Sequence, residues 1–125
     1  MKRIIATDRA PGALGPYSQA VGAGEFVFLS GQVGIDPATG KIAAGDVGGQ
    51  VRQVLENLSA VLEAAGMTME NVVKTTIFLA SMDDFSVVNE VYGSYFAENP
   101  PARATIEVSK LPLGALVEIE AIAKK

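Results

Sequence analysis

The sequence predicts an α+β domain, because two segments with helical spacing of apolar residues alternate with several short strand-like runs. Turns rich in glycine and proline separate these segments. The chain has 125 residues, of which 49% are apolar and 19% are charged, so it can close one hydrophobic core but not two. We therefore expect a single domain that spans residues 1–125.

The first strands are expected near the N-terminus. Arg3 to Ala6 is short and apolar, as in an edge strand, and the run APGALGP then breaks it and predicts a loop. Residues 25–33, EFVFLSGQV, combine aromatic and β-branched side chains and favour a buried strand. The turn DPATGK follows, and KIAAG is expected to complete a hairpin.

A first amphipathic helix is predicted from Asp46 to Ala65. Its apolar residues recur with helical spacing, and its charged residues lie elsewhere on the cylinder. Asp46 is expected as the N-cap and Gly66 as the C-terminal stop. Residues 74–80, KTTIFLA, then return to a composition typical of strands.

A second helix is predicted to begin at Ser81, where Asp84 follows three residues later as in a capping box. Pro100 and Pro101 stop it. The residues expected to form its buried stripe are Phe85, Val88, Tyr92 and Phe96.

The last third of the chain predicts two strands, Arg103 to Ser109 and Leu116 to Ala123. The segment KLPLGA joins them, so we expect them to pair as a hairpin. Each strand has one apolar face, which is expected to meet the helices, and one polar face. In the first strand Arg103, Thr105 and Glu107 share the polar face.

Two helices on one side of a sheet leave the other side uncovered. This uncovered side is expected to contain either Phe28 and Ser30 or Val27 and Leu29, depending on which way that strand faces. An exposed apolar sheet face favours self-association. We therefore predict an oligomer.

The composition excludes several classes of chemistry. The chain has no cysteine and no histidine, which excludes disulfides, thiolate nucleophiles, Ser-His-Asp triads and the usual zinc ligand sets. Its net charge of −4 and its lack of a Lys/Arg run argue against a nucleic-acid partner and favour a small molecule or another protein. No apolar run could span a membrane, and the N-terminus does not resemble a secretory signal, so the cytoplasm is expected.

Three charged residues are candidates for chemistry. Arg103 lies at the start of a strand, where a guanidinium could hold a planar carboxylate through two hydrogen bonds, although a surface ion pair would also explain it. Glu118 and Glu120 lie in an apolar alternating strand. Either could have a raised pKa and act as a general base, or both could lie on a solvated face.

Several small polar groups and glycines lie in apolar surroundings. Tyr17, Ser30 and Asn89 could line a pocket or satisfy nearby backbone groups. Gly31 and Gly34 indicate a bulge or a close approach of the backbone. No phosphate-binding loop is present, because both the Walker lysine pattern and the dinucleotide GxGxxG pattern are missing.

Four segments together resemble the RidA family, also called YjgF or the 2-imino acid deaminases. They are LGPYSQA, VFLSGQVGIDPATG, VVKTTIFLASMDDFSVVNEVY and PPARATIEVSKLPLGALVEIEAIA, and the resemblance runs from about Ile4 to Lys124. It implies a chorismate-mutase-like fold, with a six-stranded mixed sheet and two helices packed on one face. It also implies a homotrimer with clefts between chains.

The resemblance implies an activity as well. Family members hydrolyse enamine and imine intermediates such as 2-iminobutanoate and 2-iminopropanoate, which pyridoxal-phosphate enzymes release, to 2-keto acids and ammonia. No metal or organic cofactor is implied. Because an iminium carbon is already electrophilic, the protein only has to hold the carboxylate and deprotonate a water molecule.

Individual residues match the positions of the family's site. Arg103 matches the arginine that binds the substrate carboxylate, and Glu118 matches the glutamate that orients the attacking water, a role for which Glu120 stays an alternative. The positions that line the cleft are Tyr17, Ser30, Gly31 and Asn89. Thr105 stands where many members have cysteine, and the segment AENPPAR before Arg103 is shorter than in relatives with a longer loop. Both differences bear on substrate preference.

Two other functions use the same features. A non-catalytic trimer that binds small carboxylates or keto acids would need Arg103 but not Glu118. A ribonuclease or translation inhibitor, a role attached to some family members, is disfavoured by the negative charge and the missing histidine.

Overall fold

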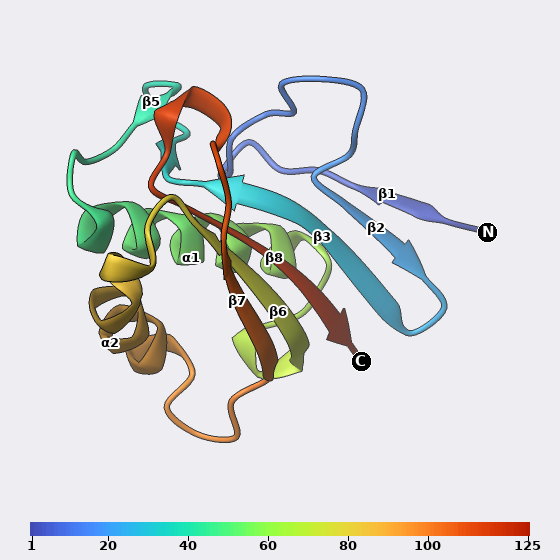
Figure 1. The fold of residues 1–125 in the computed structure, drawn as a ribbon. Coiled ribbons are helices and arrows are strands. Elements are labelled where there is room, and N and C mark those ends of the chain that lie inside the picture. Colours follow the sequence, from blue (N-terminus) through green and yellow to red (C-terminus); the bar gives the residue numbers. More distant parts are fainter.

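The computed structural model describes residues 1–125 as a sheet with two helices on one side (Figure 1). The main sheet has six strands in the order β1-β2-β3-β8-β6-β7, and its neighbours are antiparallel except for the parallel pair β6 and β7. The predicted α+β class is therefore confirmed. The helices are α1, Val47–Ala64, and α2, Phe85–Tyr95. The strands are β1 Arg3–Ile5, β2 Ala20–Ala23, β3 Phe26–Val33, β4 Ile35–Asp36, β5 Lys41–Ile42, β6 Val72–Leu79, β7 Ala102–Glu107 and β8 Val117–Lys124.

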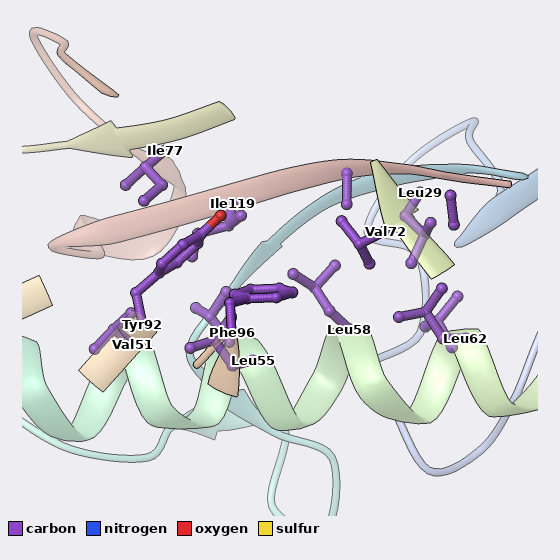
Figure 2. Close-up of a cluster of buried hydrophobic side chains, with 14 of the residues drawn as sticks. Leu29, Val51, Leu55, Leu58, Leu62, Val72, Ile77, Tyr92, Phe96 and Ile119 are labelled. Atoms are coloured by element: carbon purple, nitrogen blue, oxygen red, sulfur yellow. The ribbon is translucent and has the colours of Figure 1, made fainter. Parts of the chain in front are cut away.

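Helix α1 begins and ends within one residue of its predicted limits. The Asp46 carboxylate accepts a hydrogen bond from the backbone N–H of Gly49 at 3.0 Å, as an N-cap does. Gly66 ends the helix with φ of +74°, a conformation that glycine adopts at little cost. In Figure 2, Leu55, Leu58 and Leu62 point from α1 toward the sheet, where all three are buried.

Helix α2 begins later than predicted. The Ser81 hydroxyl caps a short 3-10 turn, η2 (Met82–Asp84), by accepting a hydrogen bond from Asp83 N–H at 3.1 Å, and α2 follows from Phe85. The expected buried stripe is confirmed for Val88, Tyr92 and Phe96, but Phe85 remains 36% exposed. Phe85 stays exposed because it lies in the first turn of α2, at the rim of the core rather than over its centre.

The expected hairpin of the last two strands is wrong. β6 lies between β7 and β8 and pairs in parallel with β7 and antiparallel with β8. The connection of β7 to β8 therefore passes beyond the end of β6, through the 3-10 turn η3, Pro112–Gly114. Proximity in the sequence suggested a hairpin, but the position between these strands belongs to the more apolar β6, whose core-facing residues join the same buried cluster as residues of both helices.

The apolar face of each of the last two strands was expected to meet the helices. This expectation is confirmed for β8 and wrong for β7. On β8, Val117, Ile119 and Ala121 face the helices and are buried. On β7, however, the polar residues Arg103 and Thr105 face the helix side, in register with the buried Thr75 and Ile77 of β6. Ile106 consequently lies on the uncovered side and is 45% exposed. A polar face can turn inward here because β7 is an edge strand beside a cleft rather than a central strand.

The uncovered side of the sheet carries Phe28 rather than Val27 and Leu29, which settles the two alternatives for β3. Phe28 is exposed, whereas Val27 and Leu29 are buried. A register shift between Leu29 and Gln32 confirms the bulge expected at Gly31. At Gly34, an added Cβ would lie 2.8 Å from the backbone oxygen of Gln50 in α1, which confirms a close backbone approach there.

Two short elements complete the fold. The hairpin expected from KIAAG exists as β4 and β5, which form their own two-stranded sheet. β2 was not predicted, since its residues AVGA have little strand character, and it forms because it pairs with both β1 and β3.

Neither helix combines the length and the apolar character that crossing a membrane would require.

Candidate functional site

Arg103 lies on the edge strand β7 and extends beneath α2. The Cζ atom of its guanidinium group lies 5.6 Å from the centroid of the Phe85 ring and 5.1 Å from that of the Tyr92 ring. Both distances are in the range of cation–π interactions. The salt bridges of the chain join Arg9 to Glu63 and Lys124 to Glu25, so the surface ion pair considered for Arg103 is not formed. The guanidinium keeps its hydrogen-bond donors free.

A pocket of about 430 Å³ opens beside this guanidinium. Residues of α2, the following loop and β7 line it, and they are Asn89, Tyr92, Gly93, Phe96, Pro100, Pro101 and Arg103. The helix ends at Tyr95, before the two prolines that were expected to stop it, and these prolines instead form part of the pocket wall. The short AENPPAR segment therefore borders the space next to Arg103, as the sequence suggested.

Two buried polar atoms near Arg103 have no hydrogen-bond partner. They are Oδ1 of Asn89 and Oγ1 of Thr105. Thr105 follows Arg103 on the same face of β7, and Asn89 lies on α2 between the two aromatic residues that flank the guanidinium. Buried polar atoms are nearly always paired in folded proteins. Asn89 lines the same pocket as the free guanidinium, so its unpaired oxygen favours a polar ligand there.

Glu118 lies on the uncovered side of β8, against Gly31. An added Cβ on Gly31 would lie 2.5 Å from Oε2 of Glu118, so only glycine leaves room for this carboxylate. Burial raises the pKa of Glu118, and the charge of Glu120 raises it further. Glu120 is itself exposed. The environment of Glu118 is therefore the more suitable one for a general base.

Ser30 and Tyr17 lie near the Gly31 end of this region, and both satisfy backbone groups. The Ser30 hydroxyl donates to the carbonyl of Ser18 at 2.7 Å, and the Tyr17 hydroxyl accepts from the N–H of Leu14 at 3.2 Å. Tyr17 is nevertheless 49% exposed, so part of it remains available for contact.

The loop that carries Tyr17 is held by one buried side chain, Gln19. Its amide nitrogen donates to the carbonyls of Thr7, Ala10 and Pro11, at 3.1, 3.3 and 2.8 Å. Its amide oxygen accepts from the N–H of Thr7 at 2.7 Å. Gln19 therefore fixes the shape of a loop that otherwise has little regular structure. The sequence analysis did not identify this residue.

The predicted site residues form two groups that lie apart within one chain. One group contains Arg103, Asn89 and Thr105 on the helix side of the sheet. The other contains Glu118 with Gly31, Ser30 and Tyr17, and its carboxylate lies on the uncovered side. β6 separates β7 from β8, so the two key strands are roughly 10 Å apart. Arg103 and Glu118 of the same chain thus do not converge on one small molecule.

Three residues that contact or support Arg103 were not identified as site residues from the sequence. Phe85 and Tyr92 were expected only as part of a buried stripe, and Thr75 only as part of a strand. Thr75 and the Tyr92 hydroxyl form a buried hydrogen bond of 2.7 Å. A tyrosine and a threonine at buried positions were the available signal, because a buried hydroxyl requires a partner.

Comparisons with known proteins agree on one family. The sequence model of the family described as Endoribonuclease L-PSP matches residues 7–125. The human 2-iminobutanoate/2-iminopropanoate deaminase is 49% identical over 123 residues, which cover 98% of this chain and 90% of the human protein.

Solved structures show the same relationship. A protein of the conserved Rid family from Yersinia pestis superposes with a TM-score of 0.97 at 49% identity, and the match covers 100% of each chain. Escherichia coli TdcF with bound serine superposes with a TM-score of 0.94 at 44% identity, and the match covers 98% of each chain.

Proposed function

This chain belongs to the Endoribonuclease L-PSP family, the family also known as RidA or YjgF, and from that premise we propose that it hydrolyses 2-imino acids to 2-keto acids and ammonia. Relatives about half identical over nearly the whole chain are named 2-iminobutanoate/2-iminopropanoate deaminases. Their names agree with the activity expected from the sequence. The substrates are small anions that carry a carboxylate next to a C=N bond.

The observation that carries this proposal is the free guanidinium of Arg103. It has no acidic partner, lies against two aromatic rings and borders a pocket. An arginine in this state can bind a planar carboxylate through two parallel hydrogen bonds. Asn89, whose Oδ1 has no hydrogen-bond partner, lines the same pocket.

In the proposed chemistry, Glu118 is the group that accepts a proton from the attacking water. Its oxygen accepts a proton from water while the water oxygen forms a bond to C2 of the imino acid. The C=N electron pair of the protonated imine moves to nitrogen and gives a carbinolamine, and protonated Glu118 then returns its proton to that nitrogen. As the C–N bond breaks, an oxygen lone pair forms the C=O bond and the hydroxyl proton passes to Glu118 or to solvent, so ammonia leaves and the 2-keto acid remains. A carboxylate with a raised pKa is a stronger base than an ordinary glutamate, which suits this proton transfer. Catalysis by the protein's own groups then requires binding, orientation and one proton acceptor.

We place this reaction between chains of a homotrimer, because Arg103 and Glu118 of one chain lie on different sides of the sheet. Tyr17, Ser30 and Gly31 accompany Glu118, and Asn89 and Thr105 accompany Arg103. The exposed apolar residues on the uncovered side of the sheet support self-association. The chorismate-mutase-like arrangement and a cytoplasmic location belong to the same proposal.

The test is a coupled assay in which threonine dehydratase generates 2-iminobutanoate. We expect Arg103→Ala to lose at least about 100-fold in kcat/KM, since bidentate carboxylate binding orients the substrate. Arg9→Ala is the matched control, because it removes an exposed arginine that pairs with Glu63. Wild-type rates in Arg103→Ala would contradict the assignment.

Two other functions predict different results when the same wild-type and variant proteins are assayed. A non-catalytic carboxylate-binding protein would bind 2-ketobutanoate equally well as wild type and as Glu118→Gln, and wild type would show no deamination. The family description names an endoribonuclease, but a net charge of −4 and the absence of histidine argue against RNA cleavage here. RNA cleavage that is lost in Arg103→Ala would favour that function.

A further inference from the structure

The position of the Arg103 guanidinium depends on two aromatic rings that differ in their own support. Phe85 lies at the rim and is 36% exposed, whereas Tyr92 is only 5% exposed. The Tyr92 ring also packs against the Phe96 ring, with 4.6 Å between the centroids. Tyr92 is therefore the more firmly held of the two surfaces on which Arg103 rests.

The far end of Tyr92 is fixed by one hydrogen bond. Its hydroxyl lies 2.7 Å from Oγ1 of Thr75, and either hydroxyl can be the donor. Figure 2 shows the Tyr92 ring extending from α2 to the sheet, with its oxygen at the sheet end. Thr75 is directly opposite Arg103 in the parallel register of β6 and β7. Tyr92 thus contacts two neighbouring strand positions, one through its hydroxyl and one through its ring.

Thr75 is unusual for its place in the sheet. It is 1% exposed, and the other residues of β6 buried on the core side are Val72, Ile77 and Leu79. Packing alone would be satisfied there by valine, which has nearly the same shape, and a buried hydroxyl is unfavourable unless it has a partner. The threonine is explained by its bond to Tyr92.

We propose that Thr75 is a positioning residue for substrate binding: it holds the Tyr92 hydroxyl and thereby fixes the ring on which the Arg103 guanidinium rests. This inference rests on the proposed function and adds a residue to its binding site. Thr75 itself does not touch the substrate. It acts through Tyr92 on the orientation of the carboxylate-binding group.

The expected kinetic effect follows from this indirect role. The carboxylate is bound in the ground state and in the transition state alike, so a poorly oriented Arg103 weakens both similarly. Loss of the Thr75–Tyr92 bond should therefore raise KM for the imino acid and Kd for the keto acid product while kcat changes little. A purely structural role would instead lower the amount of folded protein and leave KM and Kd of the folded fraction unchanged.

The experiment compares Thr75→Val, Thr75→Ser and Tyr92→Phe. Thr75→Val removes the hydroxyl but keeps the shape, Thr75→Ser keeps the hydroxyl, and Tyr92→Phe keeps the ring without its hydroxyl. Tyr95→Phe is the matched control, because that tyrosine lies on the same helix but bonds to Glu56 of α1. Kd for 2-ketobutanoate is measured by calorimetry, and KM and kcat by the dehydratase-coupled assay.

We expect Thr75→Val and Tyr92→Phe each to raise KM and Kd on the order of tenfold, with kcat within about twofold of wild type. Thr75→Ser and Tyr95→Phe should resemble wild type. Wild-type Kd in folded Thr75→Val or in Tyr92→Phe would overturn the inference. If Thr75→Val does not fold, the Kd values of Tyr92→Phe and Thr75→Ser still test the inference.

Failure of the proposed function would look different. In that case wild type itself would show no turnover, yet the change of Kd for 2-ketobutanoate among the variants would still test whether Thr75 positions Arg103. Turnover by wild type together with identical Kd values in all variants would leave the deaminase proposal intact and reject the role of Thr75.

Discussion

Gly31 shows at the level of a single residue how the chain makes room for a functional carboxylate. A Cβ at this position would lie 2.5 Å from Oε2 and 2.9 Å from Cδ of Glu118. Side-chain atoms at the end of a flexible glutamate can move away, so the fold does not require glycine here. Glycine is required instead for the observed position of the Glu118 carboxylate.

We therefore expect Gly31→Ala to fold normally but to lose roughly tenfold or more in kcat/KM, because the Glu118 carboxylate is displaced from its place. Thermal unfolding and the coupled assay measure the two properties separately. Gly12→Ala is the control, since an added Cβ there meets nothing within 4 Å. Full activity of Gly31→Ala would show that the observed place of Glu118 is not the catalytic one.

The pH dependence of activity reports on Glu118 and its neighbour. Burial and the negative charge of Glu120 hold the pKa of Glu118 above its ordinary value of 4.5. If Glu118 accepts a proton as a carboxylate, activity falls as the pH falls through this raised pKa. Glu120→Gln removes the charge that contributes to the shift, so the acid limb of kcat/KM should move to lower pH.

The measurement is the pH profile of kcat/KM for wild type and Glu120→Gln, with the coupling enzyme in excess at each pH. Glu118→Gln should abolish the acid limb together with most of the activity. An unchanged acid limb in Glu120→Gln would instead assign that limb to another group.

At the scale of secondary-structure elements, the two helices are joined by a hydrogen bond from the Tyr95 hydroxyl to Oε2 of Glu56, at 2.7 Å. Burial, followed by the bond to Glu56 and the charge of Glu56, raises the pKa of Tyr95 from 10.0 to about 12. This contact lies on the α1 side of α2, away from Arg103. It contributes to the placement of α2 over the sheet.

The raised pKa predicts a pH-dependent contribution to stability. Below about pH 10 Tyr95 is protonated in both the folded and the unfolded chain, and the contribution is fully present. Between pH 10 and about 12 the unfolded chain loses this proton first, so the free energy of unfolding falls.

We expect the difference in unfolding free energy between wild type and Tyr95→Phe to shrink over this range. Urea denaturation at a series of pH values measures it. A difference that is independent of pH from 9 to 12 would contradict the prediction, as it would place the Tyr95 pKa in the folded chain near that in the unfolded chain.

The elements also show what sequence patterns can and cannot predict. Long amphipathic or β-rich segments were predicted to within a few residues, because α1, β3, β6 and β8 each bury one strongly apolar face. β2 was missed because small residues carry little local signal and the strand depends on its neighbours. The order of β6, β7 and β8 was wrong because long-range pairing is not encoded in the alternation of a single strand.

The candidate site was predictable to a different degree. Arg103 and Asn89 line one pocket, Thr105 lies on the same face of β7 as Arg103, and Glu118 is found against Gly31. The separation of these two groups could not be predicted, since it depends on which face of β7 turns inward. Phe85, Tyr92 and Thr75 were missed as site residues because their roles arise from contacts between elements that are distant in the sequence.

At the scale of the whole molecule, the uncovered side of the sheet exposes apolar residues that nothing within a single chain covers. Phe28 and Ile106 are 46% and 45% exposed there, in the company of the half-buried Ile122 and the carboxylate of Glu118. Exposed apolar side chains on a sheet face favour association between copies. In the proposed homotrimer, the Glu118 group of one chain meets the Arg103 group of another.

A mixing experiment tests the shared site directly. Arg103→Ala and Glu118→Gln chains carrying different affinity tags are co-expressed, and assemblies that contain both chains are purified and assayed with 2-iminobutanoate. Each variant alone should be nearly inactive. In every trimer that contains both variants, one of the three interfaces combines an intact Arg103 with an intact Glu118, so activity should return to about a third of wild type. Mixed assemblies that stay as inactive as their parents would contradict a site built from two chains.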